Sequence, residues 1–207
     1  MKLLIASNNA HKHQELREIF AALGPFSAAI ELITPRQAGV DIDPDESADT
    51  YAGNALLKAR GFARALADAA PAEALWVIAD DSGLEVDALH GAPGLFSARY
   101  HKAAPGGDGC AALLGELTGV PNASRGARFQ CAIVLIDPDG SEHTFFGTCE
   151  GRIGFEKRGV GGFGFDPVFM LPSDTRSLAE YAAAEKHRIS HRGVAARKAI
   201  AFLSGKQ

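Results

Sequence analysis

Two adjacent carboxylates, Asp80 and Asp81, are the residues of this chain best placed to do chemistry. They follow an apolar run at residues 75–79 that predicts a buried strand ending at the pair. Ligands of open α/β sheets bind outside the carboxyl ends of strands, and two carboxylates there offer oxygen ligands for Mg²⁺ or an acid/base pair. A serine and a glycine come next, so a turn that merely ends the strand is the alternative. The polar, glycine- and proline-containing stretch at residues 91–100 favours a functional site.

A polar loop without glycine, SNNAHK at residues 7–12, is a second candidate. It lies between a short apolar strand predicted at 3–6 and a helix predicted by the apolar stripe within residues 16–23. A loop in this position points backbone N–H groups and the positive end of the helix dipole at an anion, and Lys12 adds a full charge. An ordinary helix cap, supplied by a serine or asparagine of the loop, is the alternative.

Two further loops carry groups that suit a nucleotide. The acidic loop at residues 39–50 contains Glu46 and precedes a long helix predicted over 50–69; it either brings a carboxylate to a metal or is simply solvated. The loop at residues 157–169 is rich in glycine and contains three phenylalanines. Glycine lets a backbone approach a flat ligand closely, and an aromatic face stacks on a base. A tight, irregular loop with core aromatics is the alternative.

Cationic side chains gather at residues 186–192, where the pattern predicts the entrance of the last helix after a helix over 178–186. Cations gain nothing from the positive end of a helix dipole, so this placement favours an anionic ligand. A solvated helix end is the alternative.

The composition fits one compact domain over residues 1–207, because 46% of the residues are hydrophobic and can form a sizeable core. No apolar run is long enough to predict a membrane span, and the first residues do not predict a signal peptide. Three cysteines without CxxC spacing indicate reduced thiols in a cytoplasmic protein. The formal net charge of -4 argues against a duplex nucleic-acid partner.

The remaining patterns predict an α/β fold with a mixed sheet. Apolar segments at 129–136 and 142–149, separated by a Pro-Asp-Gly turn, predict a β-hairpin beside the strand–helix units. Cations for phosphates, carboxylates for Mg²⁺ and an aromatic ring for a base together describe a nucleotide hydrolase or transferase. A phosphatase that releases orthophosphate, and a non-catalytic nucleotide sensor or RNA-binding module, are the alternatives.

Several stretches together resemble the inosine triphosphate pyrophosphatase-like family, most closely its bacterial branch. One such match is weak evidence, but six in family order over nearly the whole chain are specific. The matching stretches are SNNAHK at 7–12, ESADTYAGNALLKA at 46–59, ADDSGLEVDAL at 79–89, GAPGLFSARY at 91–100, GGFGFDPVF at 161–169 and SHRG at 190–193.

The resemblance implies Mg²⁺-dependent hydrolysis of ITP, dITP or XTP to the monophosphate and pyrophosphate. It also implies an elongated mixed β-sheet flanked by helices, in two lobes with a central substrate cleft, and a homodimer. By position in the matching stretches, Asp81 is the catalytic residue and also holds the metal together with Glu46. The substrate-binding residues implied in the same way are Ser7, Asn8, Asn9, Ala10, His11, Lys12, Lys58, Ser82, Phe163, Gly164, Phe165, Asp166, Lys186, His191 and Arg192.

Within this set the expected roles differ. Lys12 would hold the triphosphate, and Phe163 would stack on the base. Backbone N–H groups or Arg192 would donate to the O6 atom of a 6-keto purine, where adenine presents a donor instead. Asp81 or its neighbour Asp80 would deprotonate the attacking water, and the family pattern favours Asp81.

The chain departs from the family pattern at two positions. Gly53 stands where the family has a glutamate, and Phe165 stands where it has a tyrosine. Neither change removes a carboxylate on which the expected reaction depends.

Overall fold

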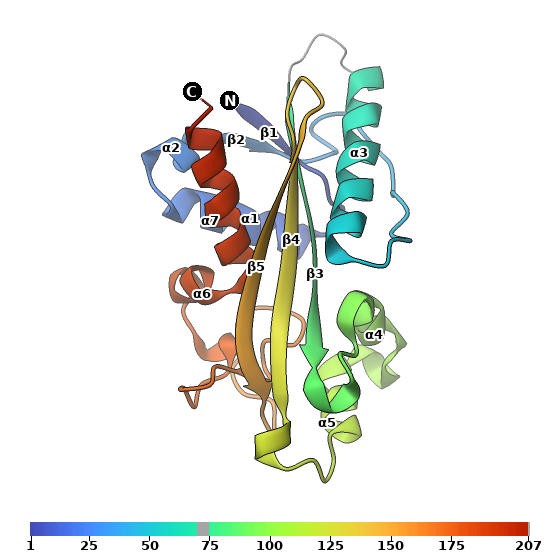
Figure 1. The fold of residues 1–207 in the computed structure, drawn as a ribbon, viewed down its shortest axis with the longest axis vertical. Coiled ribbons are helices and arrows are strands. Elements are labelled where there is room, and N and C mark those ends of the chain that lie inside the picture. Colours follow the sequence, from blue (N-terminus) through green and yellow to red (C-terminus); the bar gives the residue numbers. More distant parts are fainter. Residues whose placement is uncertain (70–74, 207) are drawn as a thin grey trace. The chain divides into compact units, whose positions relative to one another are not determined.

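The structure, a computed structural model, describes residues 1–69 and 75–206 (Figure 1). Its strands are β1 (Lys2–Ile5), β2 (Glu31–Ile33), β3 (Trp76–Val86), β4 (Gly126–Ile136), β5 (Glu142–Ile153) and β6 (Phe169–Met170). Its helices are α1 (Ala10–Ala22), α2 (Pro25–Ala28), α3 (Tyr51–Ala69), α4 (Ser97–Ala103), α5 (Gly109–Glu116), α6 (Ala183–Ile189) and α7 (His191–Ser204). The short helix α2 was not predicted, because Pro25 reads as a stop signal yet occupies its first turn.

Over the described residues, six strands form one sheet in the order β2-β1-β3-β4-β5-β6. Strand β1 is parallel to both β2 and β3, whereas β5 is antiparallel to β6. The predicted hairpin is β4 and β5, closed by a turn in which Gly140 N donates to Asp137 O at 2.9 Å. The predicted α/β fold with a mixed sheet is therefore confirmed.

The chain forms two compact units, and β3, β4 and β5 contribute residues to both. The first unit comprises Met1–Asp81, Cys131–Gly147 and Arg192–Gln207, and the second comprises Ser82–Gln130 and Thr148–His191. A single two-lobed domain stays a prediction. None of the helices in the described ranges combines the length and apolar composition needed to cross a membrane.

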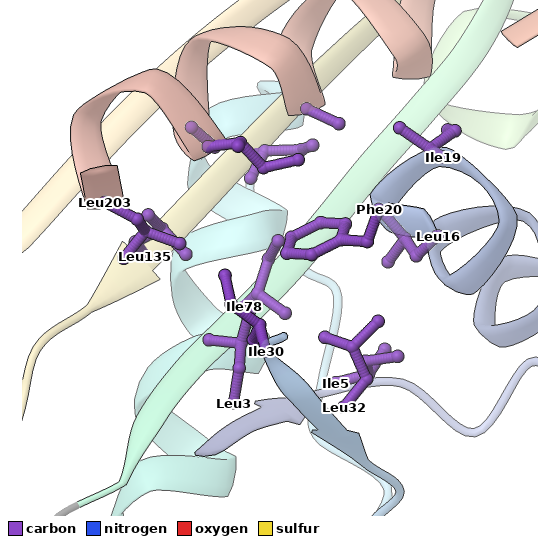
Figure 2. Packing of buried hydrophobic residues seen from close by; sticks show 14 of the residues in the cluster. Leu3, Ile5, Leu16, Ile19, Phe20, Ile30, Leu32, Ile78, Leu135 and Leu203 are labelled. Carbon is purple, nitrogen blue, oxygen red and sulfur yellow. The ribbon is translucent and has the colours of Figure 1, made fainter. Parts of the chain in front are cut away.

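The sheet of the first unit is covered on both faces. Helices α1 and α7 pack on one face, where Phe20 of α1 points toward Ile78 of β3 (Figure 2). Helix α3 packs on the other face, against residues such as Leu4 and Val77. Successive strand residues point to opposite faces of the sheet, so Ile78 packs in one core and Val77 in the other. The residues that follow them in β3 alternate in the same way.

The predicted end of β3 at residue 79 is wrong, since the strand continues through the acidic pair to Val86. Asp80 points to the α1/α7 face and Asp81 to the α3 face, and each carboxylate meets cations there. Charges paired in this way can stay inside a strand. The parallel neighbour β1 ends at Ile5, with Ala6 N donating to Ile78 O at 2.7 Å, so the pair lies just beyond the end of that neighbour.

The second unit has its own core. It gathers Leu84 and Val86 of β3, apolar residues of α5, and Phe129, Phe165 and Phe169. Strand β6 approaches β5 closely at Gly151, where a Cβ atom would lie 2.4 Å from the Met170 carbonyl oxygen and 2.4 Å from the Phe169 ring.

This close approach makes Gly151→Ala a test of the packing of β5 on β6. The variant should lower the free energy of unfolding by about 1–3 kcal/mol, because backbone or ring must move to admit the methyl group. Gly115→Ala is the matched control, since Gly115 is exposed in α5 with no atom within 4 Å of the new carbon. It should raise stability by about 0.5–1 kcal/mol. Chemical denaturation measures the free energy of unfolding of both variants. A Gly151→Ala variant as stable as the parent protein would contradict the close packing of β5 on β6.

Candidate functional site

Lys58 of α3 joins two carboxylates from separate segments. Its Nζ lies 2.6 Å from Oε1 of Glu46, in the acidic loop, and 3.2 Å from Oδ1 of Asp81, in β3. Burial would lower the pKa of Lys58, but Asp81, Asp80 and Glu46 outweigh burial and raise the pKa. The side chain is therefore a buried ammonium, and Glu46 and Asp81 meet at a single positive charge.

Asn54, one helical turn before Lys58, makes a second link between the same segments. Its Nδ2 donates to Oδ2 of Asp81 at 3.3 Å, and its Oδ1 accepts from the Ala48 backbone N at 2.9 Å. Sequence reasoning missed Asn54. The available signal was its spacing of four residues from Lys58, which places both polar side chains on the buried face of one helix.

The opposite face of β3 holds a buried group of four charges. Asp80 Oδ2 accepts from Arg192 Nε at 3.0 Å and Nη2 at 2.8 Å, and lies 3.2 Å from Lys12 Nζ. Arg192 Nη1 donates to Oε2 of Glu15. Burial would raise the pKa of Asp80, but Lys12 and Arg192 outweigh burial and hold it well below its usual range. The four charges thus balance within the core.

The two neighbouring carboxylates therefore have different environments. The Asp80 side chain is fully buried and held by two cations, whereas that of Asp81 is 11% exposed. A base that accepts a proton from water needs access to that water. Of the two candidates for the base, this arrangement favours Asp81.

The loop at residues 7–12 forms an ordinary helix cap, as the alternative interpretation held. Asn9 is the N-cap of α1, and its side chain accepts from the backbone N of His11 at 2.9 Å and of Lys12 at 3.3 Å. The loop is also fastened to the acidic loop, because Asn8 Nδ2 donates to Ile42 O at 2.8 Å. Ala10 and His11 are exposed, and Ser7 is buried. The helix cap does not exclude the expected phosphate contact, since the Lys12 side chain lies next to the cap.

Backbone N–H groups or Arg192 were expected to contact the base, and the Arg192 side chain is 1% exposed and engaged by Asp80 and Glu15. A contact with substrate would require this buried side chain to become accessible. Glu15 was missed in the sequence, although a glutamate beside Leu16 in the apolar stripe of α1 was a signal for a buried charge.

In the second unit, Asp166 holds the glycine- and phenylalanine-rich loop together. Its Oδ2 accepts from Phe163 N at 2.7 Å and lies 2.7 Å from Lys186 Nζ. Gly162 has a φ of +68°, and a Cβ there would lie 2.1 Å from the same carboxylate oxygen, so only glycine fits. The Lys186 ammonium also lies 5.1 Å from the centre of the Phe163 ring.

The two phenylalanines of this loop have different surroundings. Phe163 is half-buried, so part of its ring is accessible for stacking on a base. Phe165 is 2% exposed and packs against Tyr100. Among the other expected contacts, Gly164 is exposed, Ser82 is half-buried, and His191 is buried with its ring stacked on Phe129. Phe163 is thus the ring of the pair that remains accessible.

The prediction for the cationic cluster is wrong in part. The helix predicted over 178–186 is instead a 3₁₀ turn at Leu178–Glu180 followed by α6, because Tyr181 and Ala182 are extended. Lys186, His187 and Arg188 therefore lie in the last turn of α6, where the helix dipole favours cations. Only His191 and Arg192 lie at the entrance of α7. The dipole argument for an anionic ligand no longer applies to the first three.

The carboxylates of the first unit fit a magnesium ion. Within the described residues, no three His, Cys, Asp or Glu side chains form a complete metal cage. Mg²⁺ does not need one, because it keeps several waters and binds through one or two carboxylates plus substrate phosphates. Glu46 and Asp81, which reach the same positive charge, are a donor pair of this kind.

Known proteins are similar to this chain in sequence along nearly their whole length. The chain is 41% identical over 206 residues to a dITP/XTP pyrophosphatase of Desulforamulus reducens, covering 99% of this chain and 96% of that protein. It is 44% identical over 196 residues to a protein of the same name from Opitutus terrae, covering 93% of each.

Solved structures and a family profile agree with these relatives. The Ham1 protein of Coxiella burnetii superposes with a TM-score of 0.80 at 34% identity, over 99% of both chains. The Ham1 protein of Staphylococcus aureus superposes with a TM-score of 0.79 at 35% identity, over 100% of both chains. The profile of the Ham1 family matches residues 3–202. The predicted resemblance is confirmed, and this chain belongs to the Ham1 family.

Proposed function

We propose that this protein hydrolyses the non-standard purine nucleoside triphosphates dITP, XTP and ITP to the monophosphate and pyrophosphate, with Mg²⁺ as cofactor. The observation that carries the proposal is the meeting of Glu46 and Asp81 at one buried ammonium, that of Lys58. Two carboxylates drawn to one positive charge provide the oxygen ligands that a magnesium–phosphate complex needs. The relatives named dITP/XTP pyrophosphatase support the choice of substrate.

Glu46 and Asp81 are the proposed metal ligands. A bound Mg²⁺ would offset the charge of the phosphate oxygens and of the leaving pyrophosphate. Asp81 orients a water and accepts its proton as the water oxygen attacks the α-phosphorus. The bond from that phosphorus to the bridging oxygen breaks, and the electron pair leaves with pyrophosphate. Asp80, paired with Lys12 and Arg192, takes no proton in this scheme.

Lys12 is the proposed phosphate contact at the start of α1. Its side chain is 14% exposed, so its ammonium can reach a ligand while it remains anchored to Asp80. Asn8 and Asn9 hold the loop in shape through the contacts described above, and the Ser7 hydroxyl accepts from Asn9 N at 3.1 Å. Positioned cations of this kind stabilise charge that develops on the transferred phosphoryl group.

The glycine- and phenylalanine-rich loop is the proposed base contact, with Phe163 as the stacking ring. Of the two donors considered for O6, backbone N–H groups are favoured, because Arg192 is already engaged by Asp80 and Glu15. Adenine would place a donor against such a donor, and each buried mismatch costs on the order of 1–3 kcal/mol. A homodimer and a cytoplasmic location complete the proposal; the homodimer rests on the family resemblance and the location on the unpaired cysteines.

Identification of the products tests the proposed reaction. Phosphate is measured from ITP, XTP, dITP, ATP and GTP, with and without added inorganic pyrophosphatase. The nucleoside monophosphate is measured separately with Mg²⁺ or EDTA, because inorganic pyrophosphatase itself needs Mg²⁺. We expect phosphate from the first three substrates only when pyrophosphatase is present, and their monophosphates only with Mg²⁺. Phosphate released without pyrophosphatase would identify a stepwise phosphatase. Nucleotide binding without turnover would identify a sensor.

Substitution of each aspartate to asparagine separates their roles. Asp81→Asn should lower kcat about 10²–10⁴-fold, because the water loses its base and the metal loses a ligand. The free energy of unfolding of Asp81→Asn should change little, since Lys58 retains its ion pair with Glu46. Asp80→Asn should instead lower the free energy of unfolding by on the order of 3–5 kcal/mol, because Arg192 and Lys12 lose a buried partner. Full turnover by Asp81→Asn, measured beside chemical denaturation, would remove Asp81 from the mechanism.

Arg192→Lys tests whether Arg192 donates to the O6 atom of the base and so distinguishes ITP from ATP. A lysine keeps the charge but cannot bridge Asp80 and Glu15 with a planar fork, so stability should fall. The ratio of kcat/KM for ITP to that for ATP should stay within about threefold of the parent, since loop amides read the base in the proposal. A collapse of this ratio with unchanged thermal stability would assign Arg192 to the base instead.

A further inference from the structure

Asn54 occupies a position that the proposed reaction does not yet explain. It is 4% exposed, and its amide reaches two places at once: the Asp81 carboxylate at 3.3 Å and the Ala48 backbone N at 2.9 Å. An amide is uncharged and carries both an N–H donor and an oxygen acceptor, so one side chain can make both contacts. Asn54 therefore ties β3 to the segment that immediately follows Glu46.

The helix holds Asn54 firmly in this position. Asn54 N donates to Thr50 O at 3.0 Å in the first turn of α3, and Gly53 N donates to the Thr50 hydroxyl at 3.0 Å. Ala55 is fully buried and keeps the helix close to the sheet. A Cβ at Gly53 would lie 2.6 Å from the Cβ of Ala48, so glycine allows the acidic loop to lie against the helix beside Asn54.

The two oxygens of Asp81 have different partners. Oδ1 faces the Lys58 ammonium at 3.2 Å, and Oδ2 accepts from the Asn54 amide. A divalent cation held by Asp81 and Glu46 repels the ammonium but does not repel a neutral amide. Of the two links between β3 and the acidic loop, the one through Asn54 is thus the one that persists when the carboxylates hold a cation.

We infer that Asn54 is a positioning residue, which fixes the orientation of Asp81 and the distance between Asp81 and Glu46 for metal binding and proton transfer. This inference rests on the proposed hydrolase function. Groups that orient metal ligands in this way typically contribute 10–100-fold to metal affinity or activity. Asn54 does not itself touch the substrate in this scheme.

Asn54→Leu removes both hydrogen bonds at nearly constant size, and Asn54→Ala removes them without bulk if the leucine variant does not fold. We expect kcat for ITP to fall roughly 10–100-fold, with KM changed less than about threefold because the phosphate and base contacts are intact. Mn²⁺ binding to the substrate-free protein, followed by electron paramagnetic resonance, should weaken by about tenfold or more. This second readout does not depend on turnover.

Leu66→Val is the matched control. Leu66 is buried in the same core of α3 but lies three helical turns beyond Asn54, so its truncation costs stability without touching Asp81. We expect it to keep parental kcat and Mn²⁺ affinity at a similar loss of thermal stability. Equal losses of activity in Leu66→Val and Asn54→Leu would reduce Asn54 to a structural residue and overturn the inference.

The two levels of the proposal fail in different ways. A parent protein that turns over ITP and binds Mn²⁺, with Asn54→Leu unchanged in both, overturns the role of Asn54 alone. A parent protein that neither releases pyrophosphate from ITP nor binds Mn²⁺ overturns the proposed function and this inference together.

Discussion

The structure depends on burying two adjacent carboxylates inside one strand. Asp80 and Asp81 point to opposite faces of β3, so each face must supply its own positive charge. An unpaired buried carboxylate would cost several kcal/mol, and the fold avoids this cost by bringing distant segments to the strand. Lys12 and Arg192, from the two ends of the chain, pair with Asp80 on one face, and Lys58 pairs with Asp81 on the other.

The two faces of β3 therefore differ, and in the proposed function Asp80 stabilises the fold whereas Asp81 takes part in the reaction. On the Asp80 face, ion pairs of Asp80 and Glu15 with Arg192 fasten α1 and α7 to β3. On the Asp81 face the Lys58 ammonium contacts two carboxylates, Glu46 and Asp81, whose oxygens are ligands of the kind that a divalent cation binds. In the second unit Asp166 has a comparable structural role, since it fixes the loop that presents Phe163.

Features with a local cause could be predicted from the sequence. The strand–loop–helix at the amino terminus, the acidic loop, the β-hairpin and the glycine- and phenylalanine-rich loop all follow from patterns within about twenty residues. Glu46 and Asp81 were named as a pair by resemblance to a family, and the structure brings both to Lys58. The pattern could not show that Asn54 links Asp81 to the Ala48 backbone, because that arrangement needs a helix, a loop and a strand to meet.

The errors have the same origin. Asp80 and Asp81 read locally as the end of a strand, but cations from far along the chain let β3 continue to Val86. The cluster at 186–192 reads as one helix entrance, but a break at Tyr181 shifts the helix boundaries and places Lys186 in a last turn. The assignment of Arg192 to the substrate stays a prediction, but its buried partner Glu15 could not be identified because it is 177 residues away in the sequence. In the first two cases long-range charge pairing or a backbone break overrode the local pattern.

The most direct test of this account is a crystal structure of the protein with Mg²⁺ and an ITP analogue whose α,β-bridging oxygen is replaced by carbon. The account predicts a metal ion coordinated by oxygens of both Glu46 and Asp81 at about 2.0–2.1 Å, with Asp80 still paired to Arg192. A metal ion bound to Asp80, or a Glu46 side chain turned away from the metal, would contradict it.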